Sequence, residues 1–215
     1  MATAVGVVVF PGTNCEMDAV AAVEGLGGDG RLLWHGDEDL TGVDAVIVPG
    51  GFAHGDYLRP GAIARFSPMM GAIARFAADG GSVVGICNGF QVLTRTKLLP
   101  GALGHNAQGR FDCRWVVLET EVKSKSVWTS GIEDPIHCPI AHGEGRYVHP
   151  DPDSLAAAGQ VALRYRSTNP NGSVADIAGV CDSSGVVLGL MPHPENHIVA
   201  RQHPHHGRSA AVKTR

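Results

Sequence analysis

Short apolar runs alternate with helical patterns through the first half of the chain. The runs that predict strands are residues 5–10, 31–34, 43–48 and 82–86. Apolar residues at helical spacing predict a helix over residues 16–26. A second helix is expected to about Ala78, with Ser67 as its N-cap and Pro68 at its first position. Continuous apolar strands separated by helices indicate a parallel sheet that is covered on both faces.

The second half of the chain has a different pattern, in which strands predominate. Its predicted strands are residues 111–122, 136–141, 161–165, 174–181 and 186–191, with a short helix at 152–158. The segment 182–185, Asp-Ser-Ser-Gly, is typical of a hairpin turn between the last two strands. The expected fold is therefore α/β, an open and mostly parallel sheet flanked by helices, with an antiparallel portion in the second half.

Length and composition favour one domain. The chain has 215 residues, of which 44% are hydrophobic and 18% charged, and this excludes a disordered acidic chain or a coiled coil. Single cores stop growing only near ~250–300 residues, so one core can include nearly the whole chain. We expect a single domain over residues 1–200 and a loose polar tail over residues 201–215.

Charge and cysteine usage exclude several classes of partner. A formal net charge of −4 gives no basic surface for a nucleic acid. The apolar runs are far shorter than the ~20 residues that a membrane span requires, and no basic residue precedes the first run as in a secretory signal. The five scattered cysteines form no C-x-x-C pair. We therefore expect a cytoplasmic protein without nucleic-acid or membrane partners.

The strongest chemical motif is Gly85-Ile-Cys87-Asn-Gly89, which joins a buried strand to an apolar helical pattern. This is the nucleophile-elbow arrangement with cysteine in place of serine. The turn places Cys87 at a helix N-terminus, where peptide dipoles favour the thiolate, and aims the Asn88 N–H at a developing oxyanion. The alternative is that Cys87 is a small buried hydrophobe, as most free cysteines are. The strand, glycines and helix together favour the nucleophile.

A base for this nucleophile is expected in Met-Pro-His193-Pro-Glu195, which follows the last apolar strand. The two prolines keep the segment extended, so His193 and Glu195 project to the same side. Glu195 can then orient the imidazole while His193 takes the thiol proton. A metal site through His193, Glu195 and His197 is less favoured, because zincins need a helical H-E-x-x-H. We expect no metal in the site.

A glycine turn after a strand supplies candidate oxyanion donors. Gly50, Gly51 and Phe52 follow the run 43–48, and either Gly51 or Phe52 could provide a second N–H beside Asn88. The segment 25–30 matches G-x-G-x-x-G but follows a helix, which is the reverse of the dinucleotide-binding order. No G-x-x-x-x-G-K-[ST] motif occurs, so the chain has no recognisable nucleotide-phosphate loop.

Together these motifs resemble the class I glutamine amidotransferases. Within that class the sequence is similar to the glutamine amidotransferase subunits of phosphoribosylformylglycinamidine synthase, a resemblance that runs from about Val5 to Glu195. The segments that carry it are FPGTNCE (10–16), PGGFAHGDYLRPGAIARF (49–66), GICNGFQ (85–91), AHGEG (141–145), NPNGSVADIAG (169–179) and MPHPE (191–195).

The resemblance implies a flavodoxin-like fold. It also implies that this chain releases ammonia from glutamine and that other subunits use the ammonia. Cys87 would attack the side-chain amide of L-glutamine, His193 would be the base that Glu195 orients, and Gln91 with the segment His142, Gly143 and Glu144 would hold the substrate. Ammonia would pass to a large synthetase subunit, and a small accessory subunit is also implied. This chain would carry no cofactor, while ATP and magnesium belong to the synthetase. Members of the family usually continue into an apolar C-terminal helix, whereas the polar tail of this chain has no apolar face.

Two enzymatic alternatives and one non-enzymatic alternative stay open. The chain could be an amidotransferase that serves another pathway, or a cysteine hydrolase of the G-x-C-x-G type. The hydrolases place the acid before the histidine, whereas His193 precedes Glu195 here. A binding module without catalysis is disfavoured because Cys87, His193 and Glu195 are all present. We also expect the docked partner to complete the oxyanion hole by turning the backbone of Gly50–Phe52.

Overall fold

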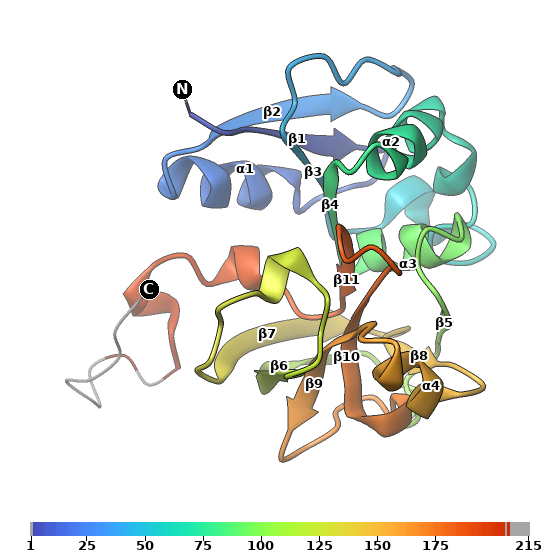
Figure 1. Cartoon of the computed structure of the whole chain (residues 1–215), viewed down its shortest axis with the longest axis vertical. Helices are drawn as coiled ribbons and strands as arrows, with labels where there is room; N and C mark the ends of the chain where they lie inside the picture. The colour runs from blue at the N-terminus through green and yellow to red at the C-terminus, as the bar shows by residue number, and fades with distance from the viewer. Residues whose placement is uncertain (1, 205, 207–215) are drawn as a thin grey trace.

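A central sheet organises the chain. The structure is a computed structural model and describes residues 2–204 and 206. Among these, nine strands form one sheet in the order β2-β1-β3-β4-β11-β10-β9-β6-β7, and β5 pairs with β8 apart from it (Figure 1). The strands are β1 Ala4–Val9, β2 Asp29–Trp34, β3 Ala45–Val48, β4 Ser82–Ile86, β5 Ala102–Gly104, β6 Asp112–Thr120, β7 Ile136–His142, β8 Arg146–Val148, β9 Val161–Arg166, β10 Ile177–Cys181 and β11 Val187–Leu190.

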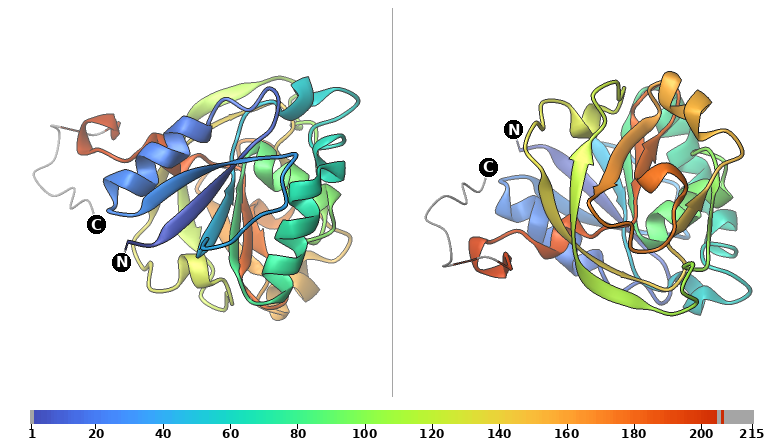
Figure 2. Two further views of the ribbon diagram at one scale, coloured as in Figure 1. Left: turned by 90° about the horizontal axis from the view of Figure 1, so that it is seen from above. Right: turned by 90° about the horizontal axis from the view of Figure 1, so that it is seen from below.

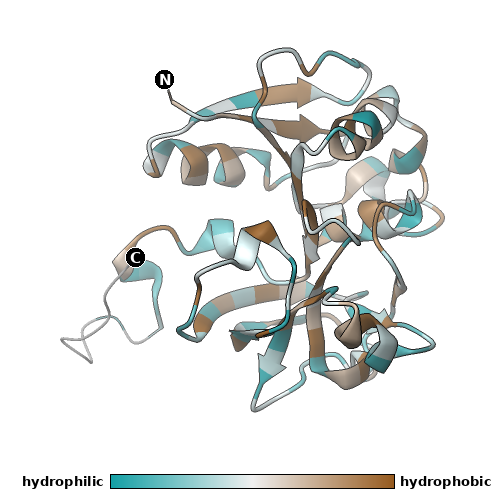
Figure 3. Ribbon diagram, viewed as in Figure 1, coloured by the Kyte–Doolittle hydropathy of each residue, from teal (hydrophilic) through white to brown (hydrophobic). Residues whose placement is uncertain are grey.

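The first half of the sheet is parallel, and apart from its largely exposed edge strand β2 it is covered on both faces. Strands β2, β1, β3, β4 and β11 run parallel to one another. Helix α1 (Glu16–Gly25) lies on one face, and α2 (Pro68–Ala78) and α3 (Asn88–Arg95) lie on the other (Figure 2). Colouring by hydropathy shows the apolar character of these inner strands (Figure 3). Their continuous apolar runs follow from burial on two sides.

The second half of the sheet is antiparallel. Strands β10, β9, β6 and β7 continue the sheet beyond β11, each antiparallel to its neighbour. In the turn between β10 and β11, the Asp182 carboxylate accepts hydrogen bonds from the N–H groups of Ser184, Gly185 and Val187. Helix α4 (Pro152–Ala157) precedes β9, and the Asp151 carboxylate caps it by accepting from the Ser154 N–H. The expected fold class is confirmed.

Four local expectations differ from the structure. The segment around His193 was expected to be extended, but Pro194–Asn196 forms a 3₁₀ turn, since proline is well tolerated at the first position of a helical turn. The predicted strand 174–181 begins only at Ile177, because Val174–Asp176 forms a 3₁₀ turn with positive φ at Ala175. Ser67 precedes α2 as predicted, but its hydroxyl makes no cap and instead lies 3.0 Å from His35 Nδ1. The short strands β5 and β8 were not predicted, since three residues carry too little pattern.

The C-terminal prediction is only partly covered by the structure. Most of the predicted tail, residues 205 and 207–215, lies outside the described residues, and the domain boundary at residue 200 stays a prediction. In the part of the chain that the structure describes, no helix is both long and apolar enough to cross a membrane.

We expect Gly89→Ala to destabilise the fold strongly. A Cβ at residue 89 would lie 1.8 Å from the Val48 carbonyl oxygen, and that oxygen belongs to the rigid strand β3. The free energy of unfolding should fall by at least about 3 kcal/mol in urea titrations. The matched control is Gly71→Ala in α2, where the nearest atom is Arg75 Nη1 at 3.6 Å. That variant should gain about 0.5–1 kcal/mol, and equal stability of both variants would contradict the steric argument.

Candidate active site

Cys87 occupies a strained turn between β4 and α3. Its backbone has φ 50° and ψ −103°, a conformation that non-glycine residues rarely adopt. The turn is tight enough that a Cβ at Gly85 would lie 2.8 Å from backbone atoms of Gly89. The predicted elbow is therefore present, and both flanking glycines are sterically required.

His193 and Glu195 form a buried pair beside this turn. The ring Nδ1 of His193 lies 2.6 Å from Glu195 Oε1, and the His193 N–H donates to the Pro139 carbonyl. Burial lowers the pKa of His193, but interactions with the thiols of Cys15 and Cys87 and with the Glu195 carboxylate outweigh burial and raise it. The pair is thus suited to carry the proton of a neighbouring thiol.

The pairing of β4 with β11 explains why these residues meet. The two strands are parallel neighbours, with Ile86 opposite Leu190. The Cys87 N–H donates to the Leu190 carbonyl at 2.8 Å. Both strands therefore end at one edge of the sheet, which is where open α/β sheets place their sites.

The predicted oxyanion donors lie at the same edge. Helix α3 begins at Asn88, and the side-chain oxygen of Asn88 accepts from the Ala53 N–H. Gly51 has φ 125°, which only glycine adopts readily. The Phe52 N–H donates to the Gly12 carbonyl at 3.2 Å, so in this structure it is not available to an oxyanion.

Gln91 and the segment 142–144 meet opposite the turn. The Gln91 Nε2 donates to the Glu144 carbonyl at 2.8 Å, and its Oε1 accepts from Asn88 Nδ2. His142 is buried, and burial together with the nearby His193 lowers the pKa of His142 to about 4. His142 is therefore neutral at physiological pH.

Two asparagines hold the segment that contains His142. The Asn106 Oδ1 lies 3.1 Å from His142 Nδ1 and accepts from the Gly145 N–H. The Asn171 Nδ2 donates to the Gly145 carbonyl at 2.8 Å. Asn171 belongs to the NPNGS segment, so that segment positions the wall of the site from behind.

A cavity of about 360 Å³ opens in front of the Cys87 thiol. Eight of the predicted site residues line it, namely Gly51, Phe52, Cys87, Gln91, His142, Gly143, Glu144 and His193. Asn88 and Glu195 are buried behind its wall. The structure therefore brings every predicted site residue to one place.

Nine further residues line the cavity, and three of them have ionisable side chains to which the sequence analysis gave no role. Cys15 lies between β1 and α1, and Asp56 and Arg59 lie in the loop after β3. Arg59 pairs with Glu144 at 3.0 Å, and Asn88 donates to Asp56 at 2.9 Å. The sequence pattern does contain a signal for these residues. It predicts β1 and β3 as strands of one parallel sheet, so the segments that follow them reach the same edge.

The loop that carries Asp56 is conformationally strained. His54, Asp56 and Leu58 all have positive φ, of 54°, 52° and 69°. Burial and the neighbouring Glu144 raise the pKa of Asp56 to about 6, against the hydrogen bond from Asn88 that lowers it. A strained backbone and an ionised, half-buried carboxylate both lower the stability of the fold. Such features cluster at functional sites.

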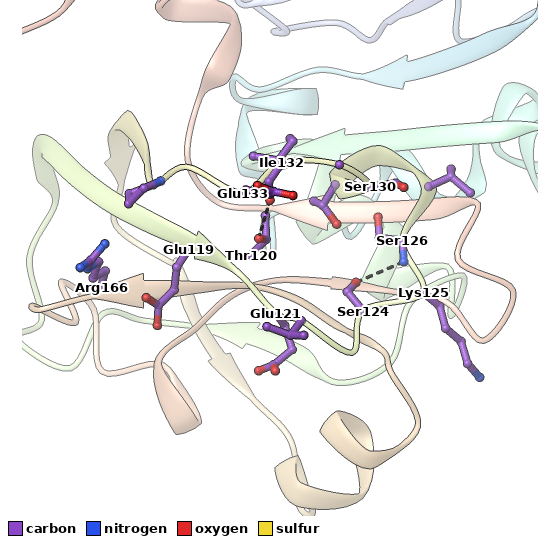
Figure 4. A pocket seen from close by; sticks show the side chains of 15 residues that line it. Glu119, Thr120, Glu121, Ser124, Lys125, Ser126, Ser130, Ile132, Glu133 and Arg166 are labelled. Atoms are coloured by element: carbon purple, nitrogen blue, oxygen red, sulfur yellow. Dashed lines mark hydrogen bonds between the residues drawn. The ribbon is translucent and has the colours of Figure 1, made fainter. Parts of the chain in front are cut away.

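A larger hollow of about 830 Å³ lies elsewhere, beyond the end of β6 (Figure 4). Its polar lining includes Glu119, Glu121, Lys125 and Arg166. No cysteine or histidine is among its lining residues, and it shares none of them with the Cys87 cavity. Of these two cavities, only the smaller one combines a thiol with an imidazole.

The Cys87 cavity is equipped for covalent catalysis on a small zwitterion. A thiol, an oriented imidazole and nearby backbone N–H groups are the parts that acyl transfer needs. Asp56 and Glu144 present negative charge and Arg59 positive charge at the cavity wall. A ligand that carries both an ammonium and a carboxylate would find partners of both signs.

Comparison with known proteins agrees with this geometry. Residues 2–214 match the family described as the CobB/CobQ-like glutamine amidotransferase domain. Phosphoribosylformylglycinamidine synthase subunit PurQ of Parasynechococcus marenigrum is 55% identical over 196 residues, 89% of each chain. The same subunit of Rubrobacter xylanophilus is also 55% identical, over 89% of this chain and 88% of its own. The solved structure of PurLQS from Thermotoga maritima matches at 42% identity with a TM-score of 0.85, covering 94% and 92% of the two chains.

We expect Asp56→Asn to stabilise the chain at neutral pH. The folded state raises the pKa of Asp56 from 3.8 to about 6, so the ionised carboxylate disfavours folding above pH 6. Asparagine keeps the hydrogen bond from Asn88 and tolerates the positive φ. The gain should be about 1–2 kcal/mol at pH 8, after allowance for solvent screening. It should shrink as pH falls through 6 and vanish near pH 4, and a gain independent of pH in urea titrations would refute the assignment.

Proposed function

Because this chain belongs to the PurQ family of glutamine amidotransferase subunits, we propose that it is the glutaminase subunit of phosphoribosylformylglycinamidine synthase. In this role it hydrolyses L-glutamine to glutamate and ammonia. The observation that carries the proposal is the convergence of Cys87, His193 and Glu195 at one cavity of a chain with these relatives.

Catalysis begins with proton transfer from Cys87 to His193. The Glu195 carboxylate accepts from His193 Nδ1, which leaves Nε2 as the base. The thiolate attacks the amide carbon of glutamine, and backbone N–H groups stabilise the oxyanion. The intermediate collapses as His193 returns the proton to the departing ammonia, and a thioester remains. Water then gives a proton to His193, attacks the thioester carbon and releases glutamate, while the proton restores the thiol.

Charged residues of the cavity wall hold the backbone end of glutamine. Asp56 and Glu144 would attract its ammonium group, and Arg59 would attract its carboxylate. The Gln91 side chain and the backbone of Gly143 and Glu144 would set the distance between this end and Cys87. This arrangement favours an amino acid with a side-chain amide over a neutral ester.

Ammonia must reach a second active site, since this chain has no nucleotide-phosphate loop. A large synthetase subunit would use ATP and magnesium to convert formylglycinamide ribonucleotide to the amidine, and a small accessory subunit would complete the complex. The Thermotoga maritima structure named PurLQS supports this assembly. No cofactor belongs to this chain in the proposed reaction, and the proposed location is the cytoplasm.

Docking of the synthetase would switch on the glutaminase. The Phe52 N–H is bonded to the Gly12 carbonyl, so a second oxyanion donor requires the backbone of Gly50–Phe52 to turn. The side chains of Phe52, which lines the cavity, and of Tyr57, five residues further along the loop, are both exposed. Contact of the synthetase with these rings would couple docking to the turn and prevent wasteful glutamine hydrolysis by the free chain.

Replacing the nucleophile should abolish glutamine hydrolysis. In the complex, Cys87→Ala should lower glutamate release by at least about 10³-fold, because no thioester can form. ATP-dependent synthesis with added ammonia should persist, since the synthetase site is separate. The matched control is Cys113→Ala, an exposed cysteine on β6. Undiminished glutamate release by Cys87→Ala would refute the mechanism.

The isolated chain should be a poor glutaminase compared with the complex. We expect kcat for glutamate release to rise by about 10²-fold or more on adding the synthetase and accessory subunits, the range expected for gaining one oxyanion donor. Tyr57→Ala should weaken this activation and leave the low activity of the isolated chain unchanged.

The control for that experiment is Val122→Ala, which removes an exposed apolar side chain at the larger, separate hollow. It should leave activation intact. Equal glutamate release by the isolated chain and the complex would contradict the proposed switch while leaving the catalytic assignment untouched.

A further inference from the structure

Cys15 brings a second thiol to the catalytic pair. It lies in the loop between β1 and α1 and immediately precedes the first residue of α1. Its Sγ, a ring nitrogen of His193 and a carboxylate oxygen of Glu195 all lie within 4.8 Å of one another. The proposed reaction uses the thiol of Cys87 and assigns no step to that of Cys15.

Two polar atoms of this group have no hydrogen-bond partner among the described residues. They are His193 Nε2 and Glu195 Oε2, and both are fully shielded from solvent. The residues that carry them are only 4% and 5% exposed. Buried polar atoms are normally paired, so Glu195 Oε2 has unused capacity to coordinate a ligand, and His193 Nε2, the proposed base, is open toward the neighbouring thiols.

Because Gly50 has no side chain, Cys15 and His193 can approach each other over its backbone. A Cβ at residue 50 would lie 2.7 Å from His193 Cε1 and 3.3 Å from Cys15 Sγ. Both side chains therefore pack against the bare backbone of this glycine. Cys15 itself is partly exposed and lines the open cavity, which provides an entry path.

We propose that Cys15, His193 and Glu195 form an inhibitory binding site for a thiophilic divalent cation, with Zn²⁺ as the best fit. Thiolate sulfur, imidazole nitrogen and carboxylate oxygen are the three ligand types that zinc takes in proteins. Zinc ligands lie about 2.0–2.3 Å from the metal, so atoms within 4.8 Å of one another can reach one cation by small side-chain rotations, in which the 2.6 Å contact between His193 Nδ1 and Glu195 Oε1 opens. Water from the cavity can fill the fourth position.

Binding would stop glutaminase chemistry without altering Cys87. Coordination releases the Cys15 thiol proton to solvent and joins both His193 and Glu195 to the cation. His193 can then no longer accept the Cys87 proton while Glu195 orients it. No bond to carbon forms, so a chelator reverses the inhibition. Hard cations such as Mg²⁺ prefer all-oxygen sites and should not bind.

Direct binding to the full-length chain tests the site independently of its activity. Co²⁺ serves as a spectroscopic probe, because a cobalt–thiolate bond gives a charge-transfer absorption that other ligands do not. We expect this absorption, and its displacement by Zn²⁺, in the wild type under a phosphine reductant. Cys87→Ala should retain both, whereas Cys15→Ala should lose the absorption and bind Zn²⁺ more than about tenfold more weakly. Cys15→Ser preserves side-chain size and should also lose the thiolate absorption.

Two controls separate this site from other zinc ligands. Cys113→Ala removes an exposed thiol. His203→Ala alters a cluster of histidines beside Trp115, where the ring centroids of His197 and His203 lie 5.2 Å apart and the rings are tilted. Both variants should bind as the wild type does. In the complex, Zn²⁺ should inhibit glutamate release and a chelator should restore it, with Cys15→Ala needing a higher Zn²⁺ concentration relative to its own activity.

Three results would overturn the proposal. One is absence of thiolate-bound cobalt in the wild type. Another is loss of binding in Cys87→Ala with retention in Cys15→Ala, which would place the cation on the nucleophile instead. The third is loss of metal binding in His203→Ala alone, with binding retained in Cys15→Ala. None of these results would alter the glutaminase assignment, which depends on Cys87 and glutamate release.

Discussion

The parallel pairing of β4 with β11 is the interaction on which the site depends. It places Ile86 beside Leu190, and the bond from the Cys87 N–H to the Leu190 carbonyl joins the two strand ends directly. The nucleophile turn leaves one strand and the His193–Glu195 pair leaves the other. About a hundred residues separate them along the chain, so only the sheet brings thiol and imidazole together.

Close backbone packing is the cost of this arrangement. The turn at Cys87 has positive φ, and Gly85 and Gly89 approach neighbouring backbone so closely that no side chain fits. At Gly50 the close neighbours are instead the side chains of His193 and Cys15, which would contact any Cβ there. The loop through Asp56 adds positive φ and a carboxylate with a raised pKa. A fold with an extensive buried sheet can tolerate such strain, and the strain is concentrated where the substrate must approach backbone atoms.

Side-chain amides connect the parts of the site. Asn88 contacts both Asp56 and Gln91, while Asn106 and Asn171 hold the wall that contains His142. Amides can donate and accept without a net charge, so they tie loops together without further burial of ions. Of the charged groups at the cavity, Arg59 and Glu144 pair with each other and Asp56 accepts from Asn88, so each is held in position at the cavity wall.

The sequence by itself determined the fold class and the elbow at Cys87, because each is a local pattern of apolar spacing or glycines. It also identified the His193–Glu195 pair, although the two side chains meet across a 3₁₀ turn and not along the extended segment that the prolines predicted. Strands longer than three residues were predicted within a few positions, apart from the 3₁₀ turn at the start of segment 174–181. Local pattern does not encode strand order, so the position of Cys15 against the catalytic pair could not be predicted. Nor could the bond between the Phe52 N–H and the Gly12 carbonyl. Tertiary structure decided both, because β1, β3, β4 and β11 end at one edge only after long-range pairing has aligned them.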